Sequence, residues 1–184
     1  MAVLMLHVFS YHTGYNIVHL EADIKKRALP LADATFVDLI DSSNGVYVFL
    51  YGNEIIYVGK CSSRSFSERL AAHVSNSPHG YMNNVMQNIA WSFARPTISK
   101  KDFHDDSNEP ERTDCFNKAI GVMKEFKIAF ITFGVAYTPI VKAKIENLEK
   151  DLIKHWNPVL NRNPRQTKNN LKYKACPWIS VSRP

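Results

Sequence analysis

The segment GVYVFLYGNEIIYVGK, residues 45–60, limits the fold of this chain more than any other stretch. Two runs rich in Val, Ile, Tyr and Phe flank Gly52 and Asn53, and such runs are typical of β-strands. A two-residue connection made of turn-forming residues predicts a β-hairpin. The chain is therefore expected to build its sheet around this antiparallel pair.

The hairpin carries two tyrosines, Tyr47 and Tyr57, in the near-repeats GVY and YVG. A two-residue turn places Tyr47 near Val58, with Tyr57 one position away. A slip of one residue would move either side chain to the other face of the sheet. Two interpretations therefore stay open: two phenols that share a pocket, or two aromatic rings that pack a sheet.

The remaining segments predict a small mixed fold. The expected strands cover residues 3–9 and 128–137, and the expected helices lie within 31–43, 65–76, 80–91, 115–126 and 138–156. Residues 96–114 are polar and become acidic from 102 onward, which predicts an inserted loop. This order predicts an α/β (α+β) domain rather than the repeated βαβ units of a doubly wound fold.

The net charge, the cysteines and the apolar runs of the sequence indicate which partners, sites and cellular location to expect. The net charge of +6 favours a polyanionic partner, although charge alone is a weak signal. The three cysteines lie far apart, which argues against a disulfide framework and against a zinc site, and fits the reducing cytoplasm. The apolar N-terminal run lacks a basic cluster and is interpreted as a strand, not a signal peptide. No apolar run reaches the roughly 18 residues of a membrane helix, so no membrane partner is expected.

The C-terminal segment 162–184 is basic and contains no acidic residue. Its cations are Arg162, Arg165, Lys168, Lys172, Lys174 and Arg183. With Tyr173 and Trp178 interleaved, the segment suits a nucleic-acid backbone, where such contacts give affinity but not sequence specificity. A tail that only increases solubility is the alternative.

Two further groups of residues could carry chemistry. Arg69 and His73 are four residues apart, so a helix would present both on one face, where they could hold a phosphate oxygen; Lys60 would add a third cation. Glu149 precedes apolar Leu152, and a single carboxylate beside a core-facing stripe suits Mg²⁺, which keeps much of its hydration.

Each group also has a simpler interpretation. A pair of basic residues is most often a solvated helix face, and Lys60 could be a surface lysine at a strand end. The acid at position 149 could pair with a lysine of its own helix, namely Lys142, Lys150 or Lys154.

Taken together and in order, these elements resemble the GIY-YIG nuclease family. The resemblance rests on GVY at 45–47, YVGK at 57–60, FSERLAAH at 66–73 and LEKDLIKHWNPVLN at 148–161. It covers roughly residues 44–73 and 128–161. Valine replaces isoleucine in both tripeptides, two extra residues separate Lys60 from Arg69 relative to the repair branch, and a long insertion precedes the third strand.

The resemblance implies a fold and a set of roles. The expected fold is a small, mainly antiparallel three-stranded sheet flanked by helices, with an N-terminal extension and an insertion. The implied catalytic residues are Tyr47, Tyr57, Lys60, Arg69, His73 and Glu149, and the implied substrate contacts are Gly59, Asn161, Arg162, Arg165 and Lys168.

Within this set, one of the two phenols, Tyr47 in preference to Tyr57, is expected to orient or deprotonate the attacking water. The charges of Lys60, Arg69 and a bound metal are expected to lower its pKa. Gly59 would leave room for close approach, and Arg69 would stabilise the scissile phosphate. Glu149 would bind Mg²⁺, for which Mn²⁺ may substitute in the family. Asn161 would either buttress the site or contact the nucleic-acid backbone.

The expected organisation is a single domain, 1–184. Residues 1–43 form an extension, 44–161 the nuclease core with its insertion at about 92–127, and 162–184 the basic tail. The expected function is a Mg²⁺-dependent DNA endonuclease of the restriction or phage type. A structure-specific repair nuclease and a non-cleaving nucleic-acid-binding module are the alternatives, and a homodimer is left open.

Overall fold

The computed structural model describes residues 8–10, 16–33, 44–63, 65–74, 84–94, 98, 102–104, 109–133, 138–161 and 176–179. Its strands are β1 (Val8–Ser10), β2 (Leu29–Pro30), β3 (Gly45–Tyr51), β4 (Glu54–Cys61) and β5 (Phe126–Thr132). Its helices are α1 (Ile17–Arg27), α3 (Phe66–Val74), α4 (Asn84–Phe93), α5 (Glu109–Lys124) and α6 (Pro139–Trp156), with 3-10 turns η1 (Leu31–Asp33), η2 (Asp102–His104) and η4 (Val159–Asn161). None of these helices is long and apolar enough to cross a bilayer.

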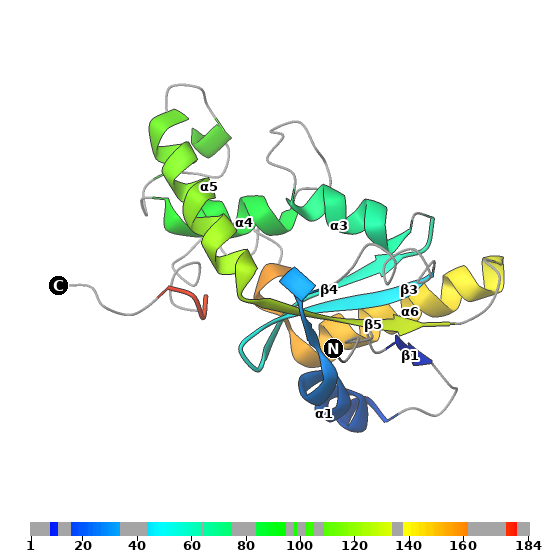
Figure 1. Cartoon of the computed structure of the whole chain (residues 1–184). Helices are drawn as coiled ribbons and strands as arrows, with labels where there is room; N and C mark the ends of the chain where they lie inside the picture. Colours follow the sequence, from blue (N-terminus) through cyan, green and yellow to red (C-terminus); the bar gives the residue numbers. More distant parts are fainter. Residues whose placement is uncertain are drawn as a thin grey trace. The chain divides into compact units, whose positions relative to one another are not determined.

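The strands form one sheet in the order β1-β5-β3-β4, with β2 also paired to β5 (Figure 1). Strand β3 is antiparallel to both β4 and β5, and β2 is antiparallel to β5, while β1 runs parallel to β5. The predicted α/β class with a mainly antiparallel three-stranded centre is confirmed. The strand expected at residues 3–9 is present at its C-terminal end as β1, with residues 3–7 outside the described part of the chain, and the structure adds the short strand β2 beside β5.

By its internal contacts the chain divides into two compact units. The first comprises Met1–Leu70 and Glu125–Asn161 and holds the sheet, α1 and α6. The second comprises Ala71–Lys124 and Arg162–Pro184 and holds α4 and α5. The predicted domain boundaries stay a prediction.

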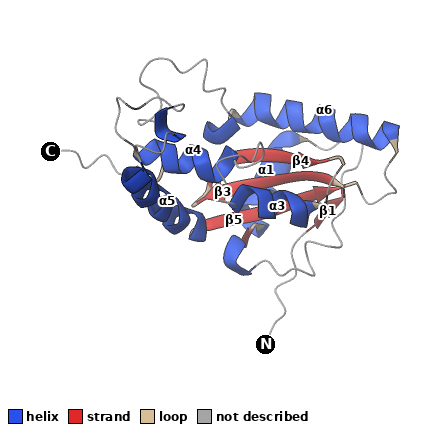
Figure 2. Cartoon of the chain, turned by 90° about the horizontal axis from the view of Figure 1, so that it is seen from above, coloured by secondary structure: helices blue, strands red, loops and turns tan. Residues whose placement is uncertain are grey.

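The core of the first unit lies between the sheet and the helices α1 and α6. Alternation along β3 sends Val46, Val48 and Leu50 into this core. Helix α6 contributes Val141, Ile145, Leu148 and Leu152 at helical spacing. Figure 2 shows α6 running alongside β4. The other face of β3 carries Tyr47 and Phe49, and the start of α3 covers it through Phe66.

The hairpin contains a β-bulge that the sequence did not reveal. Leu50 pairs with Ile55, but Phe49 pairs with Tyr57, so Ile56 is an extra residue on β4. Tyr47 consequently pairs with Gly59 rather than with its neighbour Val58. The bulge therefore moves Tyr57 onto the same face as Tyr47.

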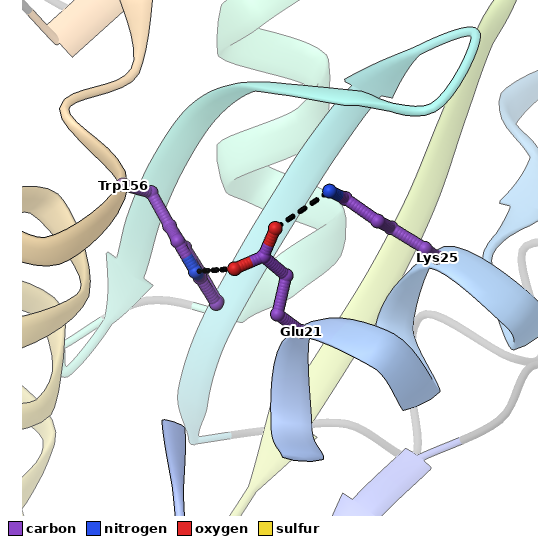
Figure 3. Close-up of polar contacts among 3 residues, drawn as sticks. All are labelled: Glu21, Lys25 and Trp156. Atoms are coloured by element: carbon purple, nitrogen blue, oxygen red, sulfur yellow. Dashed lines mark hydrogen bonds and ion pairs between the residues drawn. The ribbon is translucent and has the colours of Figure 1, made fainter. Parts of the chain in front are cut away.

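Helix α1 was not predicted, although its start carries the usual signals. Asn16 caps it by accepting a hydrogen bond from the Val18 backbone N–H at 2.9 Å. Figure 3 shows how Glu21 ties this helix to the end of α6: its carboxylate accepts from Trp156 Nε1 at 2.9 Å and pairs with Lys25 Nζ at 2.6 Å. The hydrogen bond from Lys25 is the largest cause that holds the pKa of Glu21 below its usual value, and Trp156 adds to it.

In the second unit, α4 packs against α5. Helix α5 begins at Glu109, six residues before the expected start, so part of the predicted acidic loop is helical. Trp178 is only 8% exposed and donates from Nε1 to Ser92 Oγ at 3.0 Å. The prediction that Trp178 serves a nucleic-acid surface is therefore wrong, because this ring is part of the packing around α4. The expected helix within 31–43 lies largely outside the described residues.

Candidate active site

The start of α3 is set by a reciprocal cap. Ser65 Oγ accepts from the Glu68 backbone N–H at 3.3 Å, and Glu68 Oε2 accepts from the Ser65 backbone N–H at 2.9 Å. This is the capping box encoded by SFSE, and it begins the helix that was expected within 65–76. The cap fixes where the helix begins and therefore where Arg69, in its first turns, is presented.

The two phenols share one compartment beneath α3. The Tyr47 ring is 3% exposed, and its centroid lies 6.0 Å from that of Tyr57 and 5.8 Å from that of Phe66. Gly59 makes room for this ring, since a Cβ at position 59 would lie 2.3 Å from Tyr47 Cζ. The glycine of the second tripeptide is thus required by the tyrosine of the first.

The phenol hydroxyls form a hydrogen bond with each other. Burial raises the pKa of Tyr47 far above its ordinary value, and the neighbouring Tyr57 and Cys61 raise it further. Burial also raises the pKa of Tyr57, although the hydrogen bond from Tyr47 opposes the shift. Arg69 lowers both values but does not outweigh burial. Arg69 acts in the expected direction on Tyr47, but the charges of the protein by themselves do not bring this pKa toward neutrality, and the expected contribution of a metal ion stays a prediction.

Glu149 reaches this compartment from α6. Thr138 caps the helix and accepts from the Val141 backbone N–H at 3.2 Å, and Pro139 follows in the first turn. Leu148 and Leu152 anchor the helix in the core, so the neighbouring Glu149 is held at its margin, with its side chain 16% exposed. Its charge raises the pKa of Tyr57, which places the carboxylate within electrostatic reach of that phenol.

The carboxylate of Glu149 is ion-paired with Lys60, Nζ to Oε2 at 2.8 Å. Lys60 pairs with Val46, whose side chain belongs to the core facing α1 and α6, whereas Tyr57 faces α3. Glu149 therefore interacts with groups from both faces at β4, the last strand of the sheet order. The structure gives this acid a partner on β4 in place of the helix lysines considered from the sequence.

Arg69 is half-buried and acts on the same groups. Its charge lowers the pKa of Tyr47, of Tyr57 and of the buried thiol of Cys61, although burial leaves all three raised. Sequence reasoning did not single out Cys61. Alternation along β4 from Tyr57 through Gly59 was the signal that could have placed it on this face.

Asn161, in η4, holds the edge of β4. Its Nδ2 donates to the Val58 carbonyl at 2.7 Å, and its Oδ1 accepts from the Val58 backbone N–H at 2.7 Å. The oxygen and the nitrogen of the Asn161 amide therefore both bind the backbone of Val58, the residue between Tyr57 and Gly59. Of the two expected roles for Asn161, this geometry agrees with the buttress.

Four of the expected residues are not part of the set described in the first unit. His73 lies one turn after Arg69 on α3, but it belongs to the second unit and is 4% exposed. Arg162, Arg165 and Lys168 lie outside the described residues. Within the first unit, Tyr47, Tyr57, Lys60, Arg69 and Glu149 form the assembled set.

The donor set limits which metal could be bound. In the part of the chain that the structure describes, no three His, Cys, Asp or Glu side chains cluster as a metal site. A single carboxylate suits Mg²⁺, which retains several waters and takes its remaining ligands from substrate phosphates. Glu149 fits such an ion and does not fit a cation that needs several protein ligands.

Comparison with known proteins places this geometry in a family. The chain matches the family model of the GIY-YIG catalytic domain over residues 40–179. Searches of curated proteins and of solved structures found no match. Because the family match covers well over half of the chain and includes the phenol pair, Arg69 and Glu149, the chain belongs to the GIY-YIG family of nucleases.

Proposed function

We propose that this protein is a Mg²⁺-dependent DNA endonuclease of the restriction or phage type, which hydrolyses phosphodiester bonds. Membership of the GIY-YIG family supports the nuclease activity. The observation that carries the site assignment is that the paired rings of Tyr47 and Tyr57 lie 6.0 Å apart on β3 and β4, and that Glu149 pairs with Lys60 on the same strand β4, near enough for Arg69 and Glu149 both to shift the pKa of Tyr57. These residues come from two strands and two helices, and a phosphodiester site explains why they converge.

Each group meets one requirement of phosphodiester hydrolysis. The negative charge of the substrate repels nucleophiles, and negative charge builds up in the transition state, so positioned cations lower the barrier. The guanidinium of Arg69 can hold a non-bridging oxygen at two points. Because Arg69 is half-buried, its electrostatic attraction to the phosphate is stronger than that of the same ion pair in bulk water.

The phenol pair orients the attacking water as neutral hydroxyls. Burial keeps both tyrosines protonated near neutral pH. Because Tyr57 is half-buried whereas Tyr47 is 3% exposed, Tyr57 is the phenol that contacts the water, and the adjacent Tyr47 ring fixes its orientation.

Glu149 is the residue that would hold the divalent cation. A bound Mg²⁺, for which Mn²⁺ substitutes, would supply positive charge for the leaving oxygen. The protein contributes a carboxylate that the core residues of α6 hold in place, so that the carboxylate itself needs to move little on binding.

Binding of the DNA duplex involves residues outside this set. Arg162, Arg165 and Lys168 contact the phosphate backbone, supported by the excess of basic residues in 162–184. His73 either contacts phosphate or transfers a proton, and its place in the RLAAH motif supports the restriction branch. The cytoplasm is the proposed location, in agreement with three free cysteines.

The test is cleavage of plasmid and genomic DNA with Mg²⁺, with and without a chelator. Glu149→Gln and Arg69→Ala should each reduce the single-turnover cleavage rate by roughly a hundredfold or more, as loss of one transition-state contact does. The matched control is Glu146→Gln, which removes an acid one turn earlier on α6 and should cleave like the wild type. Circular dichroism must show that all variants are folded.

Two results would refute the proposal. Cleavage that persists in the presence of chelator would show that the reaction does not depend on a metal ion. Full activity of Glu149→Gln would show that Glu149 is not part of the active site. Binding of DNA without any cleavage would instead identify a non-catalytic module. The positions of cut ends on a sequenced genome distinguish site-specific cleavage from structure-specific cleavage.

A further inference from the structure

We propose that Lys60 occupies the metal-binding carboxylate in the metal-free protein, so that a divalent cation must displace the lysine ammonium from Glu149. This inference rests on the proposed function, because it assumes that Glu149 is the metal ligand. It assigns to Lys60 a regulatory role in addition to any contact with substrate.

The geometry of the pair supports competition. Lys60 Nζ lies 2.8 Å from Glu149 Oε2, and the two side chains are 28% and 16% exposed. The Glu149 carboxylate is only partly exposed, so an ammonium group and a hydrated divalent cation must both approach it through the same small accessible surface. Two cations that bind one carboxylate oxygen repel each other strongly at this separation.

The backbone permits the exchange without unfolding. Lys60 lies at the penultimate position of β4, and its flexible four-carbon stem can turn toward solvent. Glu149 has much less freedom, because Leu148 and Leu152 hold its helix in the core. The lysine is therefore the partner that moves when a cation arrives.

Competition has a measurable consequence. Removing the lysine charge should tighten metal binding to the free protein, since no ion pair has to be broken. A partly exposed ion pair predicts a dissociation constant roughly two- to fivefold lower in Lys60→Met than in the wild type. Lys60→Arg keeps the competing charge and should bind metal no more tightly than the wild type.

The experiment is a titration of the full chain with Mn²⁺ in the absence of DNA, in which free Mn²⁺ is followed by its electron paramagnetic resonance signal. Lys142→Met, which removes an exposed charge from the same helix as Glu149, is the control for net charge. Melting temperatures establish that each variant is folded. Lys60→Gln provides a second neutral variant if the methionine variant does not fold.

The outcomes separate this inference from the proposed function. Tighter binding in Lys60→Met, with Lys60→Arg and Lys142→Met unchanged, supports competition. The inference is overturned if Lys60→Met and Lys60→Gln bind Mn²⁺ no more tightly than the wild type. It is also overturned if Lys60→Arg or Lys142→Met binds Mn²⁺ as tightly as Lys60→Met does. If Glu149→Gln binds Mn²⁺ as well as the wild type, the metal site itself is wrong, and the proposed function fails on that point.

Discussion

Substitution of Gly59 by alanine tests whether the phenol compartment is as tightly packed as the structure indicates. The added Cβ would lie 2.3 Å from Tyr47 Cζ, 2.4 Å from its hydroxyl oxygen and 2.8 Å from Cε2. Carbon atoms in contact normally stand about 3.5–4.0 Å apart, so the ring must shift by about 1 Å. The rings of Phe49, Phe66 and Tyr57 surround Tyr47 and oppose that shift.

Two magnitudes follow for Gly59→Ala. Overpacking of a closed core costs about 1–3 kcal/mol in the free energy of unfolding. A displacement of about 1 Å at a catalytic group lowers the rate by roughly a hundredfold. Urea denaturation should show a lower midpoint with an unchanged slope, and single-turnover cleavage should show the loss of rate.

A second substitution makes the test specific to the contact. Shortening the ring, as Tyr47→Leu, removes the atoms that the new Cβ would meet, so Gly59→Ala should cost less than about 0.5 kcal/mol in that background. Gly52→Ala is the control within the same hairpin. It meets nothing within 4 Å but has φ +58°, so its strain of about 1–2 kcal/mol should lower stability without lowering the cleavage rate. Equal costs of Gly59→Ala in both backgrounds would refute the reasoning.

Three further predictions concern other contacts. Asn161→Ala leaves the N–H and C=O of buried Val58 without their amide partner and should cost about 2–4 kcal/mol by urea denaturation, and a cost below about 0.5 kcal/mol would contradict the buttress. Because the pKa of Glu21 is lowered in the folded state, its stabilising effect is present above the unfolded value of 4.5 and is lost as the pH falls through the folded value. The midpoints of wild type and Glu21→Gln should therefore differ at pH 7 and converge as the pH falls below the folded-state pKa of Glu21. Trp178→Phe removes the donor to Ser92 and should cost about 1 kcal/mol, while the salt dependence of DNA binding, measured by fluorescence anisotropy, stays unchanged.

Several elements could be predicted because their signals are local. The turn at Gly52, the capping box at Ser65 and the stop of α6 before Pro158 each depend on a few adjacent residues. Helix α1 was missed because its many charged residues masked the spacing of Leu20 and Ile24. That helix gains its stability from the core, which no local pattern reports.

The expected role of Trp178 failed for a similar reason. Interleaving of aromatic and basic residues predicts a nucleic-acid surface only if the aromatic ring is exposed. Packing against α4 buries this ring, and burial depends on a helix more than eighty residues away in the chain. Sequence composition carries no information on that contact.

The residue types of the site, and the family to which they belong, were determined by the sequence alone, because motif spacing within a strand or helix is a property of adjacent residues. Only the tertiary structure decided how these residues meet. The bulge at Ile56 sets the face on which Tyr57 lies, and the packing of α6 brings Glu149 to Lys60. Periodicity repeats within an element, whereas register and contact between elements depend on the packing of side chains far apart in the chain.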